Sequence, residues 1–405
     1  MADRRVLKML PYFAALFIDT FSFGLMYPVV VALFHFHWVI REYPDAVRNV
    51  YLALAFSLFP LGMCFGASLL GDLSDALGRK RTMLICMVGL TLAYGLMWLG
   101  VASHELSWFL AGRLVSGLMA GTGPIAQAAM MDASAEDERG KRLANVVLVN
   151  SLALVSAPAL GGILGHYDFR APIVFAAVLC VLVFLWIWRS VVEPPIPRKK
   201  LVLEWSRPIQ VFAKALRHPE MSSIAASFEL FQLGVGFYYL FIMVKMTAVH
   251  HLTPFALGLF SATMGAGFVT GATIGYARAS DILKSDRTVA LFGLLVGGSL
   301  TVVTAAPIGT VAQWVLVYVI ATTIMLAYVA TLALISKAAD KSEQGWALGV
   351  GSAIVALAFF VTGLFASTLH LLPLWMLLGG GGVLILAALI PLRPRPARVA
   401  QTAVP

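Results

Sequence analysis

The stretch Gly71-Asp-Leu-Ser-Asp-Ala-Leu-Gly-Arg-Lys-Arg81 decides the fold, because it is a charged, glycine-punctuated segment between two long apolar runs. Apolar-rich sequence precedes it, and another apolar run starts at Met83. A short basic loop between two membrane spans is expected on the cytoplasmic side. The stretch therefore predicts a chain that crosses a membrane, turns here in the cytoplasm and crosses back.

The composition excludes a water-soluble protein. Of the 405 residues, 60% are hydrophobic and 12% are charged, and the mean hydropathy is +0.88. An average globular domain is about 25% charged, so these polar side chains could not cover a soluble surface. The net charge of +9 falls in loops of one side, which favours a role in membrane orientation over nucleic-acid binding.

The first apolar run, Met9 to Phe36, is too long for the apolar core of a signal peptide, which has about 7–15 residues. It also contains Asp19, so we expect it to be retained as the first span. Cys64, Cys86 and Cys180 lie inside apolar runs and show no pairing or metal-ligand pattern. We expect no disulfide framework, no metal and no cofactor.

Segments of about 20 apolar residues can cross the hydrocarbon core as helices, and the sequence contains twelve such candidates. They cover approximately residues 9–36, 47–70, 82–103, 106–131, 142–165, 171–192, 220–248, 254–277, 287–307, 311–337, 345–369 and 372–392. The predicted fold class is therefore an all-α membrane protein with twelve transmembrane helices in two six-helix, pseudo-symmetric bundles.

The basic loops alternate with poorly charged ones, which places both termini in the cytoplasm. The longest polar segment, residues 193–219, is rich in Pro and basic residues. We interpret it as a cytoplasmic linker, with a short interfacial helix around Trp205 to Leu216, between bundles at 1–192 and 220–405. A short cytoplasmic tail follows the last span.

The two halves repeat weakly at an offset of about 205–210 residues. Asp19 and Glu229 each precede a glycine by five positions, and the opening stretch aligns with residues 277–287, where Asp281 matches Asp75 and Arg287 matches Arg81. Parallel repeats about an axis along the membrane normal place a binding site between the halves, near the midplane.

The opening stretch resembles the signature loop between helices 2 and 3 of the major facilitator superfamily. The segment Leu110–Gly121, with Arg113, is similar to the fourth-helix motif of drug:proton antiporters, and residues 157–162 resemble the end of their fifth-helix motif. Asp19, followed by Pro28, is similar to the first helix of tetracycline-type efflux proteins.

The resemblance covers residues 1–195 well and the rest weakly, and Ala76, Ala153 and Ala157 depart from the family's pattern. It implies a transporter but leaves the direction of transport open.

Two acids lie inside predicted spans, Asp19 about 15 Å deep in the first and Glu229 at a similar depth in the seventh. A charge at the bilayer centre costs at least about 2.5–3.5 kcal/mol, so such residues face a cavity or a partner. We expect Asp19, Glu229 and Arg113 to couple transport to protons, with Arg113 as the natural partner of an acid or of an anionic substrate. Static pairing of buried charges is the alternative. Lys245, nearer the outer face, is expected to snorkel.

A second group lies at cytoplasmic helix ends or in the fifth span and is expected to gate the transporter. Its charged members would form a salt-bridge and helix-dipole lock, whereas Pro158 would bend its helix and the glycines would permit close contact. The group comprises Gly71, Asp75, Gly78, Arg79, Asp132, Arg139, Pro158, Gly161 and Gly162.

Polar and aromatic side chains within spans are candidates for a substrate cavity, although each could equally pack helices together. The candidates are Asp19, Phe23, Met26, Tyr27, Gln127, Asn150, Glu229, Gln232, Tyr238 and Tyr239.

The sequence thus predicts a proton-coupled antiporter that exports amphipathic or drug-like molecules by alternating access. A proton symporter that imports a metabolite and a non-transporting receptor or scaffold stay open as alternatives. We find no motif typical of an enzyme. The expected partners are a small-molecule substrate, protons and the lipid bilayer, without nucleic acid, for a monomer in a cell membrane such as the bacterial inner membrane.

Overall fold

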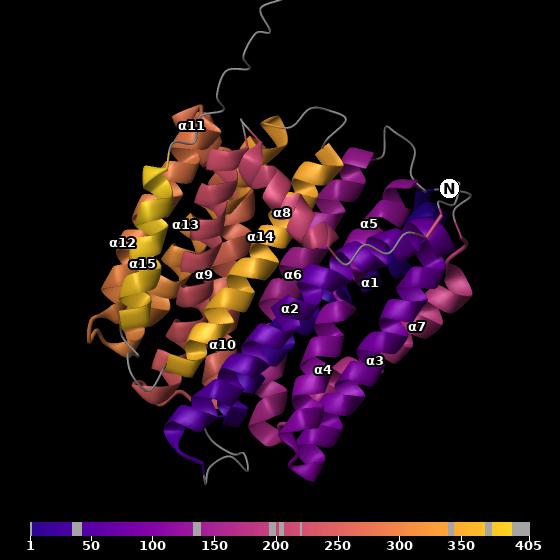
Figure 1. The fold of residues 1–405 in the computed structure, drawn as a ribbon, viewed down its shortest axis with the longest axis horizontal. Coiled ribbons are helices and arrows are strands. Elements are labelled where there is room, and N and C mark those ends of the chain that lie inside the picture. Colours follow the sequence, from indigo (N-terminus) through magenta and orange to yellow (C-terminus); the bar gives the residue numbers. More distant parts are fainter. Residues whose placement is uncertain are drawn as a thin grey trace, which may run out of the picture.

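The computed structural model describes residues 2–34, 43–132, 139–193, 200–201, 206–218, 221–338, 344–368 and 375–390. Helices lie side by side in two groups, with α1–α7 on one side and α9–α15 on the other (Figure 1). The first group contains α1 (Ala2–Ala32), α2 (Asp45–Leu77), α3 (Arg79–Ser103), α4 (Leu106–Leu118), α5 (Thr122–Asp132), α6 (Arg139–Tyr167) and α7 (Ala171–Ser190).

The second group follows the short helix α8 (Arg207–Arg217). It contains α9 (Ser222–Ala248), α10 (Pro254–Thr270), a π-helical turn (Gly271–Gly275), α11 (Tyr276–Leu283), α12 (Asp286–Ala305), α13 (Thr310–Lys337), α14 (Gln344–Leu364), a 3₁₀ turn (Phe365–Thr368) and α15 (Trp375–Leu389).

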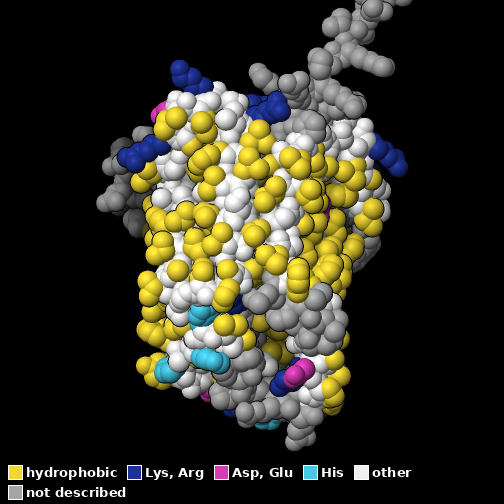
Figure 2. Space-filling view, turned by 90° about the vertical axis from the view of Figure 1, so that its left-hand side faces the viewer, with side chains coloured by type: hydrophobic (Ala, Val, Ile, Leu, Met, Phe, Trp, Pro, Cys, Tyr) yellow, Lys and Arg dark blue, Asp and Glu magenta, His cyan; other side chains and the backbone are white. Residues whose placement is uncertain are grey.

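The predicted fold class is confirmed. Within the described residues, ten helices are long and apolar enough to cross a membrane, and α15 is a shorter apolar helix. The pair α4 and α5 covers the remaining predicted span, so the arrangement is consistent with twelve crossings. Figure 2 shows a belt of hydrophobic side chains, with Lys and Arg gathered at one rim and His near the other.

The fourth predicted span, 106–131, is not one continuous helix. It breaks at residues 119–121, between α4 and α5. Pro124 has no amide hydrogen to donate to the carbonyl of Ala120, and its ring clashes with that carbonyl in a regular helix. Three residues into α5, Pro124 occupies the first turn, where the missing donor costs nothing. The proline therefore ends one helix and begins another inside the bundle.

The opening stretch is also more helical than expected, since α2 continues to Leu77 and α3 begins at Arg79. Gly78 alone separates them, with φ 107° and ψ 157°. The polar residues extend both helices instead of forming a loop, and the glycine makes the turn because its φ lies where L residues are strained.

The two groups touch mainly along two pairs of helices, α6 with α10 and α2 with α14, and α1 also contacts α9 and α10. Glycines allow the approach: a Cβ on Gly162 would lie 2.6 Å from the Cα of Gly258, and one on Gly363 would lie 2.5 Å from Ser57 Oγ. The expected close contact at Gly162 is present. A helix is present in the predicted linker as α8, which packs on α2, α9 and α14; its position at the membrane interface stays a prediction.

Candidate functional site

Asp19 on α1 lies at the start of the half-helix α5. The backbone amides of Thr122 and Gly123 donate toward its carboxylate, and a Cβ on Gly123 would lie 2.7 Å from Asp19 Oδ2. The other oxygen, Oδ1, is buried and has no hydrogen-bond partner among the described residues. A helix N-terminus presents free amides and partial positive charge. The break in the fourth span therefore creates a binding position for one carboxylate oxygen of Asp19 and leaves the second oxygen without a hydrogen-bond partner among the described residues.

Arg113 on α4 is 3% exposed. Its Nε donates to the carbonyl of Ala55 at 2.9 Å, and its Cζ lies 5.0 Å from the centre of the Phe59 ring. Both partners belong to α2, which α4 approaches closely because a Cβ on Gly117 would collide with the Phe59 carbonyl. The glycine contact between α2 and α4 thus fixes where this buried cation lies.

Among the ion pairs of the described residues, none joins Arg113 to Asp19. Tyr94 on α3 instead interacts electrostatically with both groups, and its side chain is hydrogen-bonded to Ser22. The break after Leu118 places Asp19 against α5, whereas Arg113 stays on α4 against α2. The two charges therefore occupy separate positions in the same buried polar centre.

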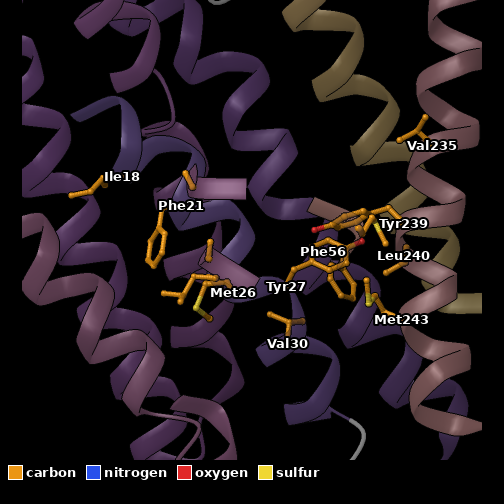
Figure 3. Close-up of a cluster of buried hydrophobic side chains, with 14 of the residues drawn as sticks. Ile18, Phe21, Met26, Tyr27, Val30, Phe56, Val235, Tyr239, Leu240 and Met243 are labelled. Carbon is orange, nitrogen blue, oxygen red and sulfur yellow. The ribbon is translucent and has the colours of Figure 1, made fainter. Parts of the chain in front are cut away.

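A small cavity lies beside Arg113, between the two groups of helices. Its volume is about 10 Å³, about the space of one water molecule. It is lined by Phe23, Tyr27, Phe56, Pro60, Arg113, Leu240, Phe359, Thr362 and Gly363. Its rings interlock: Tyr27 and Tyr239 meet at 4.2 Å between centroids, and Phe23 and Phe359 at 5.9 Å. In Figure 3, Tyr27 and Phe56 from one group of helices face Tyr239 and Leu240 from the other.

Of the residues predicted to bind substrate, Phe23 and Tyr27 line this cavity and Tyr239 packs against them. Met26 is buried elsewhere, near Phe21 and Ile18 in Figure 3. Sequence reasoning missed Phe56 and Phe359, since an aromatic residue inside an apolar span carries no mark of the cavity it faces.

The remaining polar candidates lie outside the cavity lining. Thr20, the residue after Asp19, donates a hydrogen bond to Asn150 on α6 at 3.1 Å. Gln127 is half-buried on α5. On α9, Gln232 and Tyr238 are buried, and the Tyr238 hydroxyl has no partner within the described residues. Their proposed contact with substrate stays a prediction.

Glu229 follows the start of α9 by seven residues, about 10 Å along the helix. Its similar depth to Asp19 in the membrane stays a prediction. Its Oε2 is buried without a partner in the described part of the structure. The neighbouring residue, Phe228, packs against Tyr328 of α13. Glu229 thus lies within the second group of helices.

Arg79 links three helices at the rim opposite the outer turns. It bonds Asp75 at 2.9 Å and Ser74 at 3.0 Å on α2, and Asp132 at 3.3 Å at the end of α5. This is the lock expected from sequence, apart from Arg139, whose side chain lies outside the described residues. Glu193 supports the same turn by accepting from the Lys80 amide at 3.2 Å.

Of the remaining gating candidates, Gly161 and Pro158 lie where α6 meets α1. A Cβ on Gly161 would lie 2.2 Å from the Leu25 carbonyl of α1, whereas Gly71 has open space around it. Pro158 lies inside α6 and faces Gly24 of α1. These contacts hold α6 against α1, and a gating role stays a prediction.

The second group of helices has its own version of the Arg79 lock, with the charges exchanged. Asp286 at the start of α12 pairs with Lys337 at the end of α13 at 2.6 Å and accepts from the Tyr276 hydroxyl at 2.7 Å. The helices correspond to α3 and α5, which carry the base and the acid in the first group. The charged contact thus rests on Asp286, and not on Asp281 or Arg287, which the alignment matched.

Lys245 does not snorkel to the surface. It is 5% exposed and donates to the carbonyls of Thr304 and Ala306 at the end of α12. Those carbonyls end a helix and lack intrahelical donors, which explains why they hold the ammonium. Nearby, His250 Nδ1 lies 2.9 Å from Thr310 Oγ1.

Two packed groups of apolar helices that are long enough to cross a membrane define a multi-pass membrane protein. The model of the Major Facilitator Superfamily matches residues 12–361, and the chain belongs to this family.

Among the relatives, the tetracycline resistance protein class D of Salmonella ordonez is 33% identical over 174 residues, 42% of this chain and 41% of the relative. The class G protein of Vibrio anguillarum is 34% identical over 171 residues, again 42% and 41% of the two chains. The matches thus span less than half the length of these relatives.

Solved structures share the fold over nearly the whole chain. The human organic anion transporter MFSD10 (TETRAN) is 18% identical, with a TM-score of 0.67 and coverage of 96% of this chain and 99% of that one. A D-xylose–proton symporter is 15% identical, with a TM-score of 0.73 and coverage of 95% and 96%. At these identities the likeness shows the fold alone.

Proposed function

We propose that this protein is a proton-coupled antiporter of the cell membrane that exports amphipathic, drug-like molecules by alternating access. The observation that carries the proposal is the Asp19 carboxyl, whose Oδ1 atom is buried within the apolar helix α1. One of its oxygens faces two amides, and the other has no hydrogen-bond partner among the residues that the structure describes. The amides can hold the charge of the carboxylate, and Oδ1 can carry a proton.

Export is favoured over import by the relatives, since several proteins with about 30% identity over part of the chain are tetracycline resistance proteins. The D-xylose–proton symporter shares the fold, so import with protons is the second candidate. In either direction the halves at 1–192 and 220–405 would rock about the linker at 193–219, in a monomer with both termini in the cytoplasm.

The test uses the purified protein in liposomes, with tetracycline as the first compound. Antiport predicts uptake when the liposome interior is acidic, because protons leave as the compound enters. Uptake driven by an acidic exterior would instead establish symport. Asp19→Asn should reduce gradient-driven uptake to the level of protein-free liposomes, while Glu105→Gln, at an exposed acid, should transport as the wild type. Full activity of Asp19→Asn would remove the carboxyl from the mechanism.

A further inference from the structure

The linker helix α8 carries a groove with a basic lining. The groove has a volume of about 470 Å³ and is lined by Gln210, Ala213, Lys214, Arg217 and His218. This volume falls within the range of small-ligand pockets, about 300–1,000 Å³. No acid is among the lining residues that the structure describes, so an anion would meet no like charge there.

Three of the lining side chains can donate hydrogen bonds to an anion. Lys214 has three ammonium donors, and Arg217 has a planar fork of five. The Met221 amide donates to Nδ1 of His218 at 3.3 Å, so Nε2 carries the hydrogen when that ring is neutral. Arginine binds phosphate through parallel hydrogen bonds, and lysine binds it as a point charge. The lining is therefore complementary to a phosphate group.

An aromatic residue of α14 holds two of these side chains in place. The Nζ of Lys214 lies 4.2 Å from the centre of the Trp346 ring, and the His218 ring lies 5.6 Å from the same ring. A cation over an aromatic face is attracted by the ring. The groove is thus supported by a helix of the second group, although its residues belong to the linker. Tryptophan is also enriched at the level of lipid headgroups.

An apolar line runs along α8 beside the groove. Ile209 is 65% exposed and Leu216 is 45% exposed, and residues seven apart lie on nearly the same line of a helix. The helix packs on the protein with other residues, since Ala215 is buried and Val211 and Phe212 are half-buried. An exposed apolar line next to a basic one is typical of a helix that lies in the membrane surface.

We propose that the groove binds the headgroup of an anionic phospholipid, with the phosphate on Arg217 and Lys214 and the acyl chains over Ile209 and Leu216. Free phosphate shares the headgroup chemistry, but it would leave the apolar line uncovered. The sequence predicts this linker on the cytoplasmic side, where anionic lipids attract basic segments. The site involves neither Asp19 nor a proton, so the inference goes beyond the proposed transport function and does not depend on it.

The test measures lipid binding to the purified protein in detergent by native mass spectrometry. The probes are phosphatidylglycerol and phosphatidylcholine with the same acyl chains. The wild type should bind the first molecule of phosphatidylglycerol at least about tenfold more tightly than phosphatidylcholine, because two cations act on a phosphate that choline does not neutralise.

Arg217→Gln should reduce this preference by at least about fivefold, as expected for the loss of one of the two cations. The matched control is Arg278→Gln on α11, which changes the net charge equally and should keep the preference. Both arginines are exposed, so neither substitution removes a buried side chain. Ile209→Ser should weaken the binding of both lipids alike and preserve their ratio.

Three results would overturn the inference. The first is equal affinity of the wild type for the two lipids. The second is an equal loss of preference in Arg217→Gln and Arg278→Gln, which would assign the binding to net charge. The third is displacement of phosphatidylglycerol by inorganic phosphate at equal concentration, which would assign the groove to a free anion.

Discussion

At the scale of single residues, the position of the Asp19 carboxylate depends on a glycine. Gly123 has no side chain, and a Cβ added there would lie only 2.7 Å from Asp19 Oδ2. The sequence predicted the acid because an Asp inside an apolar run is unusual. The sequence did not indicate that this acid contacts the start of α5 at Gly123, since a glycine in a span is as often a packing residue.

Replacing Gly123 by Ala should therefore impair proton coupling. The added methyl group must push the Asp19 carboxylate away from the amides of α5, so gradient-driven uptake should fall by at least about tenfold, the factor expected for roughly 1.4 kcal/mol. Gly95→Ala is the control, because nothing lies within 4 Å of that position. Equal uptake by the two variants would show that the contact of Asp19 with the amides of α5 is not needed.

His250, in the connection between α9 and α10, should make stability depend on pH. Burial and the positive charge of Lys245, with His251, lower the pKa of His250 below its usual 6.5. The unfolded chain then binds the proton at a higher pH than the folded chain, so folding is destabilised as the pH falls from above 6.5 through the lower folded pKa.

His250→Gln should reduce the fall in melting temperature between pH 8 and pH 5, measured in detergent. The same substitution at exposed His166 should leave that fall as in the wild type. A pH dependence unaltered by His250→Gln would assign the effect to other groups.

At the scale of helices, the two halves form the corresponding turn with different residues and different backbone angles. Gly78 joins α2 to α3 with φ 107°, and Lys284, which aligns with it, ends α11 with φ 52°. An L residue with positive φ costs roughly 1–2 kcal/mol, and a side chain at Gly78 would also collide with Glu193. The two aligned positions thus both have positive φ, but their ψ angles differ, 157° at Gly78 and 14° at Lys284.

The two turns supply opposite predictions. Gly78→Ala should lower the melting temperature, since it adds strain and displaces Glu193. Lys284→Gly should leave it unchanged or raise it, because the new residue adopts the observed conformation without strain. A melting temperature for Gly78→Ala equal to that of the wild type would contradict the strain argument.

At the scale of the whole molecule, the bundle was predictable because hydropathy and the alternation of charge extend over tens of residues. The cavity was not, since Phe56 and Phe359 come from helices far apart in sequence and meet only after the halves pack. Arg113 and Tyr27 were found from sequence because they are polar within spans, while the contacts of Arg113 depend on the glycines that let α4 approach α2.

The contact between Gly162 and Gly258 should close the molecule at the end that carries the connection between α9 and α10. Gly162→Leu should separate α6 from α10 there. A cysteine placed at Phe359, with the three native cysteines replaced, should then react faster with a bulky maleimide added from that side. Gly382→Leu, which meets open space, is the control, and equal rates would show that the closure lies elsewhere.

The break in the fourth span has a consequence for how the chain is made. With 13 and 11 residues, α4 and α5 extend about 20 Å and 16 Å, and neither reaches across a hydrocarbon core of about 30 Å. The amides exposed at the break cannot be left in lipid, so this segment has to enter the membrane in contact with helices synthesised before it. Because α1 supplies the Asp19 carboxylate that receives those amides, the group proposed to carry protons would also serve biogenesis, by completing the insertion of a segment that is unable to insert alone.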